Sequence, residues 1–404
     1  MIFNKKKRIY LDHASATPVS SGALKAYIEG EMSFANSHSI HKDGLFSRSF
    51  VEGAKTKIAH VLRSRTDEIY FVSSGTESDN LAISGVISKA KESGMANPHI
   101  VTTTIEHDAV LGVCKMMEKY GVSVTYVPPN EEGFIDPKDI RDAINENTVL
   151  VSVMYVNNEV GTIQPIKEIA KAIRHYKKNN PNRNILGKIS ALYPLFHTDA
   201  CQATNYLSLD VPTLGVDLLS LNGAKCYAGK GSAILYAKKG TPISPIIFSG
   251  KNTNLTPATP AIGNINALAY AIEASQQMKE RESSRLSILK KYIYESIASD
   301  ESINTRLIRT VKSENTLPCH VHFVVKGIVG ELVVLELDAR NISVSSQRAC
   351  RSEDDEDSYV VRSMGALLSE SDGSLRITLG RSTTKGDCQT FVRKIKEVIL
   401  KYPL

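Results

Sequence analysis

The chain runs Leu219-Ser220-Leu221-Asn222-Gly223-Ala224-Lys225-Cys226-Tyr227-Ala228-Gly229-Lys230-Gly231 between two apolar segments, and this stretch is the key to its architecture. The segment from Val216 to Leu221 predicts a buried strand, and the segment from Ala233 to Ala237 predicts the next one. A glycine-containing turn between them presents Lys225 at the end of the first strand. A lysine amine at such a place can lose enough hydration to become a nucleophile toward an aldehyde.

Apolar runs rich in β-branched residues alternate with amphipathic stretches from residue 50 to residue 240. This alternation is typical of an α/β fold, in which a mostly parallel sheet, here of seven strands, is covered by helices on both faces. The expected strands are Ile69–Val72, Ile100–Thr104, Val122–Val127, Val149–Val156, Leu195–Thr198, Leu218–Leu221 and Ala233–Ala237. The expected helices between them include Thr76–Lys89, His107–Tyr120 and Pro165–Lys177.

The pattern changes after residues 250–262, which are rich in Gly, Pro, Thr and Asn and suggest a domain boundary. We expect residues 15–260 to form a large domain, and residues 1–14 with 261–404 to form a smaller α+β domain. Residues 178–193 are predicted to be a surface insertion. The elements expected after the boundary are a long helix Asn264–Ser299, strand Val321–Val325, helix Gly330–Asp338, strands Ser343–Ser346 and Leu375–Leu379, and helix Gln389–Tyr402.

The composition is that of an ordinary globular protein. Of its 404 residues, 42% are hydrophobic and 23% are charged, and the formal net charge is +6. This mild positive charge favours solubility over direct nucleic-acid binding. No run approaches the roughly 20 apolar residues that span a bilayer, and the start lacks an apolar leader. We therefore expect a cytoplasmic protein without membrane contact.

Six cysteines are scattered along the chain without a CxxC pair. This spacing argues against a disulfide framework and against a zinc ribbon. Cys319-His320-Val321-His322 would put two histidines on one face of a strand, yet no second cluster completes a set of metal ligands. We expect an ordinary strand there and no metal site.

The sequence Phe71-Val72-Ser73-Ser74-Gly75-Thr76-Glu77-Ser78 passes from a strand through small residues into a helix. Free N–H groups and the positive end of that helix favour an anion, with the Thr76 hydroxyl as an extra donor. The segment therefore predicts a phosphate seat at Gly75 and Thr76. The alternative is a simple helix N-cap at Thr76.

The sequence Phe196-His197-Thr198-Asp199-Ala200-Cys201-Gln202 places Asp199 at the end of a buried strand. A carboxylate is costly to bury without a cationic partner, and a pyridinium N–H is such a partner. Because Asp199 and Lys225 follow strands of one sheet, both are expected at its carboxyl edge. The alternative for Asp199 is a helix N-cap.

Two more predicted strands end in polar side chains. Thr103-Thr104-Ile105-Glu106-His107 presents His107, which could stack on an aromatic ring or move protons. Tyr155-Val156-Asn157-Asn158-Glu159-Val160-Gly161 supplies amides. Four polar clusters at four strand ends indicate a binding site, since cores seldom keep such groups without use.

Two features of the small domain indicate how a substrate could be bound and attacked. Val344-Ser345-Ser346-Gln347-Arg348-Ala349-Cys350-Arg351-Ser352 leads into an acidic loop. We expect Cys350 to be exposed and mobile, with its thiolate favoured by the two neighbouring arginines; an incidental surface cysteine is the alternative. Downstream, Arg376 lies in an alternating strand, and its guanidinium suits a bidentate grip on a substrate carboxylate.

Together these segments resemble the NifS/IscS-type cysteine desulfurases, in the class V aminotransferase group of the fold-type I pyridoxal-phosphate enzymes. The resemblance covers nearly the whole chain, from Tyr10-Leu11-Asp12-His13-Ala14-Ser15-Ala16-Thr17-Pro18 through Asn36-Ser37-His38-Ser39-Ile40-His41 to Arg376-Ile377-Thr378-Leu379-Gly380-Arg381. It implies pyridoxal 5'-phosphate as cofactor, L-cysteine as substrate and a homodimer. It also implies a sulfur-acceptor protein, either an iron–sulfur scaffold or a tRNA-thiolation carrier.

The resemblance also implies roles for single residues. Lys225 would hold the cofactor aldehyde and move the substrate proton, and Asp199 would face the pyridine nitrogen. Cys350 would accept sulfur as a persulfide, and Arg376 would hold the substrate carboxylate. His107 would stack on the ring, and Asn158 and Gln202 would lie near the ring hydroxyl, with Asn158 also at the substrate. Gly75, Thr76 and Asn222 would hold the phosphate, helped by Thr259 from a partner subunit.

The chain departs from the family pattern at three places. The family usually has Ser and His at the positions of Asn222 and Ala224, and Gly-Ser in place of Gln347 and Arg348. The loop at 249–258 has lost its usual Glu and Arg. Two alternatives therefore stay open. One is a selenocysteine lyase or small-molecule aminotransferase of the same fold, and the other is a weakly active partner protein in sulfur transfer.

Overall fold

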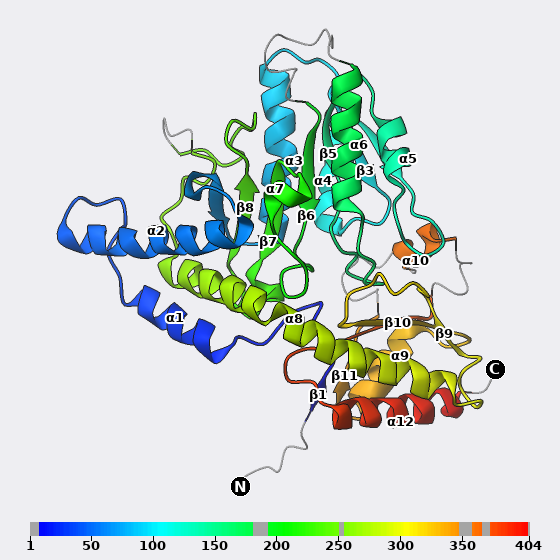
Figure 1. Ribbon diagram of the computed structural model, residues 1–404. Coiled ribbons are helices and arrows are strands. Elements are labelled where there is room, and N and C mark those ends of the chain that lie inside the picture. Colours follow the sequence, from blue (N-terminus) through cyan, green and yellow to red (C-terminus); the bar gives the residue numbers. More distant parts are fainter. Residues whose placement is uncertain (1–7, 181–192, 250–253, 347–357, 366–371, 403–404) are drawn as a thin grey trace.

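The structure is a computed structural model that describes residues 8–180, 193–249, 254–346, 358–365 and 372–402. Its centre is a seven-stranded sheet in the spatial order β2-β8-β7-β6-β5-β3-β4 (Figure 1). All strands from β7 to β4 in that order run parallel, while β8 is antiparallel to both of its neighbours. The strands are β2 Ile69–Val72, β3 His99–Thr103, β4 Ser123–Val127, β5 Thr148–Ser152, β6 Leu195–Asp199, β7 Leu218–Asn222 and β8 Ala233–Ala237. The predicted fold class is confirmed.

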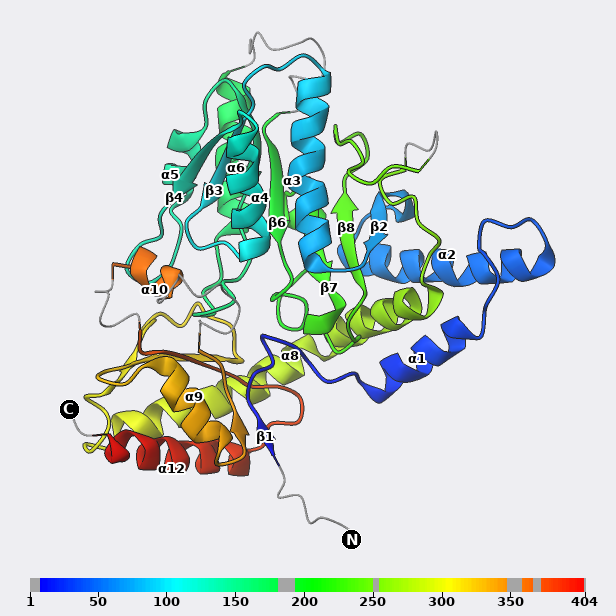
Figure 2. The same cartoon turned by 180° about the vertical axis from the view of Figure 1, so that it is seen from behind.

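Helices cover both faces of this sheet, as Figures 1 and 2 show from opposite sides. Successive residues of a strand face opposite sides of the sheet and pack into different cores. Leu218 belongs to the core under α3 and α4, and Leu219 belongs to the core under α5 and α6. This separation follows from the two-residue period of a strand. The helices are α3 Gly75–Glu92, α4 Asp108–Lys119, α5 Pro137–Ala143, α6 Ile166–Asn179 and α7 Val211–Leu214.

The smaller part of the structure combines two short sheets with helices. The order β12-β10-β9 is antiparallel, and β1 pairs in parallel with β11. The predicted strand Ser343–Ser346 is wrong in extent, because only the first of its residues belongs to β11. The elements are β1 Ile9–Tyr10, β9 Leu307–Arg309, β10 His320–Val325, β11 Ile342–Ser343, β12 Ser374–Thr378, α9 Gly330–Asp338, α10 Tyr359–Ser363 and α12 Lys385–Lys401.

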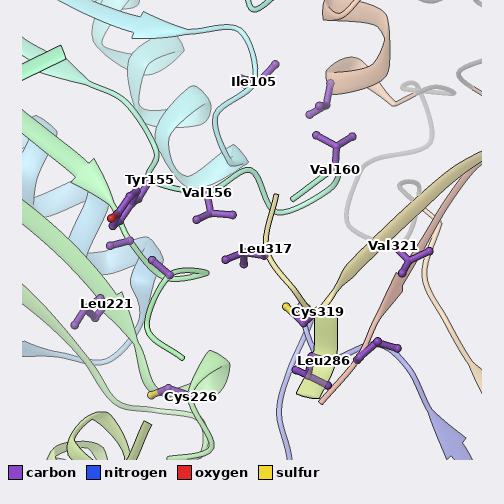
Figure 3. Packing of buried hydrophobic residues seen from close by; sticks show 14 of the residues in the cluster. Ile105, Tyr155, Val156, Val160, Leu221, Cys226, Leu286, Leu317, Cys319 and Val321 are labelled. Atoms are coloured by element: carbon purple, nitrogen blue, oxygen red, sulfur yellow. The ribbon is translucent and has the colours of Figure 1, made fainter. Parts of the chain in front are cut away.

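A single long helix, α8 (Ile262–Ala298), joins the two parts (Figure 1). It packs against α12 and also against α1 (Ser21–Glu31) and α2 (Lys42–Leu62), two helices that the sequence pattern did not predict. One hydrophobic core runs through both parts, and it includes Val156, Val160, Leu317 and Cys319. In Figure 3, Leu317 lies near Val156. The boundary at residue 260 stays a prediction.

Two further sequence features have a structural outcome. Of the predicted insertion, residues 181–192 lie outside the described residues; before them α6 continues to Asn179, and after them Tyr193 is buried. His320 and His322 are buried residues of β10, as expected for an ordinary strand. No helix in the described part of the chain is long and apolar enough to cross a membrane.

Candidate active site

The carboxyl ends of four neighbouring strands bring the predicted polar clusters together. β7, β6, β5 and β3 are adjacent and parallel, so their ends lie along one edge of the sheet. Lys225 follows β7, Asp199 ends β6, the turn with Asn158 follows β5, and His107 follows β3. This edge is where open α/β sheets bind ligands.

The amine of Lys225 is held by backbone carbonyl groups rather than by a carboxylate. Its Nζ donates to the carbonyl oxygen of Ala14 at 2.7 Å and to that of Ser15 at 2.6 Å. Burial lowers the pKa of Lys225, and the positive charge of Arg376 lowers it further. The side chain is therefore closer to its neutral, nucleophilic form than an exposed lysine is.

Asp199 is buried and does not cap a helix. Its Oδ1 accepts a hydrogen bond from the backbone N–H of Cys201 at 2.9 Å, within a turn. The next helix that the structure describes begins at Val211, with Asp210 as its N-cap, so the N-cap alternative for Asp199 is wrong. Gln202 lies on the same turn and donates from Nε2 to the carbonyl oxygen of Ala14 at 3.0 Å.

The start of α3 lies beside this turn. The N-cap residue is Ser74, whose Oγ accepts from the N–H of Glu77 at 3.1 Å, so the N-cap alternative for Thr76 is also wrong. A Cβ atom on Gly75 would lie 3.0 Å from Sγ of Cys201 and 3.3 Å from Nδ2 of Asn222. The N–H groups at the start of this 18-residue helix and the side-chain amide of Asn222 therefore lie close together, and both can donate hydrogen bonds to an anion.

Arg376 reaches the site from β12 of the small part. Its Nη1 donates to the carbonyl oxygen of Asn158 at 2.9 Å, and its Nη2 donates to Oδ1 of Asp12 at 3.0 Å and to Oγ of Ser15 at 2.7 Å. Its Nε is buried without a hydrogen-bond partner. Asp12 belongs to a quoted sequence motif, yet its role as partner of a buried arginine was not predicted.

The structure connects three other predicted site residues less directly to Lys225, Asp199 and Arg376. His107 is partly buried and caps α4, with Nδ1 accepting from the N–H of Ala109 at 3.1 Å. Thr259 is exposed and lines a separate cavity of about 440 Å³ together with Ser73 and Glu77. Cys350 lies outside the described residues.

Glu106 is a buried acid that the sequence reasoning missed, although it precedes His107. Its Oε1 accepts from the hydroxyl of Thr103 at 2.8 Å and from the N–H of Met154 at 2.9 Å, while Oε2 has no partner. Burial raises the pKa of Glu106 to about 8. The carboxyl group therefore holds its proton at neutral pH and ties the ends of β3 and β5 together.

A second missed acid, Asp79, lies behind Asp199. It is buried in α3, and its Oδ1 is 3.6 Å from Nε2 of His197. Burial, and then the charge of Asp199, raise the pKa of Asp79 well above its usual value, whereas burial lowers the pKa of His197 to about 4. Both groups are thus favoured in their neutral forms, so neither of them supplies a positive charge to pair with Asp199.

The sequence and the fold have counterparts among known proteins. The family model "Aminotransferase class-V" matches residues 9–391.

The chain belongs to this family, in its NifS/IscS-type cysteine desulfurase group. The relative "Cysteine desulfurase IscS" of Dictyoglomus turgidum is 36% identical over 400 residues, which cover 98% of this chain and 95% of the relative. A solved "NifS-like protein" has a TM-score of 0.86 at 28% identity and covers 98% of this chain and 100% of its own. A structure of "SspA in complex with cysteine" has a TM-score of 0.74 at 28% identity, and the match covers 92% of this chain and 99% of that structure's chain.

Enzymes of this family depend on pyridoxal phosphate, and the residues present here fit that cofactor. The site offers a partly buried amine with a lowered pKa in Lys225, a buried carboxylate in Asp199 and an anion seat at Gly75. Oδ1 of Asn158 is buried without a partner, which leaves an acceptor for a hydroxyl group. Asn222, where the family usually has Ser, lies at the anion seat and supplies a donor there.

We predict that Glu106→Gln changes how stability depends on pH. In the unfolded chain a glutamate ionises above about pH 4.5, whereas native Glu106 keeps its proton up to about pH 8. Native protein therefore binds more protons in this window, and stability falls as pH rises through it. Glutamine keeps the acceptor for Thr103 and Met154 without titrating.

Urea unfolding at pH 5 and pH 8 measures this effect. Between pH 5 and pH 8, the free energy of unfolding of the wild type should fall by at least about 1 kcal/mol more than that of the variant. An equal loss in both proteins would show that Glu106 does not hold its proton.

Proposed function

We propose that this protein is a cysteine desulfurase that releases L-alanine from L-cysteine and keeps the sulfur as a persulfide on Cys350. The observation that supports this best is the convergence of two basic side chains on Ser15. Lys225 donates to the carbonyl oxygen of Ser15, and Arg376 donates to its hydroxyl. An α-amino acid bound here has its amino group next to Lys225 and its carboxylate next to Arg376.

The cofactor, when bound, supplies an electron sink for the charge left at the substrate Cα. Asp199 would hold the pyridine nitrogen in its protonated form, with Asn158 and Gln202 at the ring hydroxyl and His107 on the ring face. The phosphate would lie at Gly75, Thr76 and Asn222, joined by Thr259 of the partner subunit.

Lys225 has two tasks in this proposal. Its amine would first hold the cofactor aldehyde, and after the substrate takes its place the free amine would accept the Cα proton. The lowered pKa serves both steps, because each needs the neutral amine. Arg376, whose Nε lacks a hydrogen-bond partner, would keep the substrate carboxylate in place meanwhile.

The sulfur step balances without an outside oxidant. The Cys350 thiolate attacks the sulfur of the substrate and forms an S–S bond, while the substrate C–S bond breaks. That electron pair and the thiol proton of the substrate end on Cβ, which becomes the methyl group of alanine. The enzyme keeps one neutral sulfur atom as a persulfide, ready for a second thiol on an acceptor protein.

We predict that Cys350→Ser abolishes sulfide release from L-cysteine in the presence of a reducing thiol, with at least a hundredfold loss. The visible spectrum of the bound cofactor should stay unchanged, because Lys225 is intact. The matched control is Cys388→Ala, which removes a buried thiol from α12.

Alanine and sulfide are measured together, with and without a keto acid. Full sulfide release by Cys350→Ser would remove Cys350 from the reaction. Keto-acid-dependent amine transfer without sulfide release would instead indicate an aminotransferase.

The proposal includes a homodimer formed through α1, α2 and the segment between them. In this region Phe34 is 88% exposed, Ile40 is 91% exposed and Met32 is 78% exposed. Exposed side chains of this size are expected at a contact between subunits. The cavity lined by Thr259 also borders α2, where Arg48, Val51 and Lys55 line it.

We predict that the double variant Phe34→Asp with Ile40→Asp is monomeric at micromolar concentration. Each carboxylate would have to be buried at the contact without a partner. Leu400→Asp, which changes a 54% exposed leucine of α12, is the control. Analytical ultracentrifugation measures the mass. A dimeric double variant, or a monomeric wild type, would contradict this surface as the interface.

The proposal also includes a cytoplasmic location and transfer of sulfur to an acceptor protein. The five cysteines that the structure describes are all free and buried, which suits a reducing compartment. An iron–sulfur scaffold and a tRNA-thiolation carrier are the two classes of acceptor that fit a protein-bound persulfide.

A further inference from the structure

The turn that carries Lys225 is held by Thr17 on one side. The hydroxyl of Thr17 donates to the carbonyl oxygen of Ala224 at 3.0 Å and accepts from the N–H of Tyr227 at 2.7 Å. The N–H of Thr17 also donates to the carbonyl oxygen of Ala224, at 2.8 Å. The chain is thus fixed just before and just after Lys225, and a separate contact holds the carbonyl group of Lys225 itself.

This contact comes from Asn205, a buried residue of the turn after β6. Its Nδ2 donates to the carbonyl oxygen of Lys225 at 2.7 Å, and its Oδ1 accepts from the hydroxyl of Ser275 at 2.9 Å. A carbonyl oxygen can only accept, so the amide nitrogen has to face Lys225. The amide therefore has one orientation, with both of its ends in use.

Ser275 lies within α8, the helix that joins the two parts of the structure (Figure 1). Its Oγ accepts from Nη2 of Arg381 at 2.8 Å. The guanidinium group of Arg381 also lies 3.9 Å from the centre of the Tyr227 ring, and its N–H donates to the hydroxyl of Tyr227 at 3.0 Å. The hydrogen bonds from Arg381 to Ser275, from Ser275 to Asn205 and from Asn205 to Lys225 are called the Asn205 bridge below.

The segment that carries Arg381 is fixed to α8 by a second arginine. Arg285 donates from Nη2 to the carbonyl oxygen of Gly380 at 2.8 Å and from Nη1 to that of Thr383 at 2.6 Å. Its partner Glu282, at 2.8 Å, is buried. Arg381 follows the substrate arginine, Arg376, by five residues. The Asn205 bridge therefore connects the segment that supplies Arg376 with the backbone of Lys225.

We propose that Asn205 is a positioning residue for Lys225, and that Ser275 and Arg381 act on the lysine through it. The amine of Lys225 ends a flexible four-carbon side chain, and in the proposed function it has to reach two different atoms. Only a fixed backbone keeps its starting point constant relative to Arg376. Misplacing a reacting group by about 1 Å can cost roughly a hundredfold in rate. The inference rests on the proposed roles of Lys225 and Arg376.

Exchange of the Cα proton of L-alanine with D₂O measures the step that Lys225 performs, without any sulfur transfer. The Cα–H bond breaks, the amine takes the proton, and a deuteron from the solvent returns to Cα. Proton NMR follows this exchange in the holoenzyme. The test variants are Asn205→Ala, Ser275→Ala and the double variant. The control is Asn266→Ala, which removes an equally short bond of 2.7 Å from an asparagine Nδ2 to the carbonyl oxygen of Ala26 in α1.

We expect Asn205→Ala to lower the maximal exchange rate roughly tenfold, the effect of one lost hydrogen bond on a positioned group. The KM for L-alanine should stay at the wild-type value, because Arg376 still holds the carboxylate. The midpoint of thermal unfolding should match that of Asn266→Ala. Ser275→Ala should cause a smaller loss of the same kind, and the double variant should be no slower than Asn205→Ala.

Three results would overturn the proposal. One is a wild-type exchange rate in Asn205→Ala. Another is a slow rate that comes with a raised KM or with a lower unfolding midpoint than that of Asn266→Ala, which would make the bond merely structural. The third is a double variant whose loss is the product of the two single losses, because Ser275 would then act independently of Asn205.

Failure of the proposed function itself looks different. The wild-type holoenzyme would then release no sulfide from L-cysteine. The exchange of L-alanine needs only Lys225 and the cofactor, so the comparison of the variants would still decide the role of Asn205.

Discussion

Two basic side chains lie next to each other in the site of this protein. Arg376 is buried, Lys225 is partly buried, and the positive charge of Arg376 lowers the pKa of Lys225. Burying charge without compensation costs several kcal/mol per ion. The segment from Asp12 to Ser15 solves the problem, because its two carbonyl groups solvate the amine and the carboxylate of Asp12 pairs with the guanidinium. A substrate with one amino and one carboxylate group can then use groups that are already in place.

The segment from Ile9 to Ser15 connects the small part of the structure to Lys225. β1 pairs with β11, and the carbonyl oxygen of Leu11 accepts from the N–H of Thr378 at 2.7 Å. The segment that follows is thereby carried across to Lys225. Since Arg376 lies in the same β12 strand as Thr378, the two halves of the site keep a fixed relation as long as the shared core stays packed.

Much of the fold could be predicted because the strands of the large sheet are short runs of apolar or β-branched residues bounded by turn residues. The direction of β8 could not, since an apolar run has the same pattern whichever way it points. α1 and α2 were missed because apolar side chains within them, such as Ile28 in α1 and Phe46 in α2, are exposed, which blurs the amphipathic period. The strand at 343–346 was predicted too long, because its pairing with β1 ends after two residues.

The site was predictable where a polar residue ends a buried strand, as with Asp199 and Lys225. Asp12 and Asp79 gave no such signal, because their partners Arg376 and His197 are distant in sequence and only the fold brings them together. The caps show the same limit: small residues at 73–76 predicted a helix start, but the backbone geometry that selects Ser74 over Thr76 is not visible in composition.

The central claim is that the amine of Lys225 holds the cofactor. Holoenzyme loaded with pyridoxal phosphate can be reduced with borohydride, digested, and searched by mass spectrometry for the lysine that carries the reduced cofactor. We predict that the label lies on Lys225 alone and that Lys225→Ala takes up none. A label on another lysine such as Lys230, or an unlabelled wild-type protein, would contradict the claim.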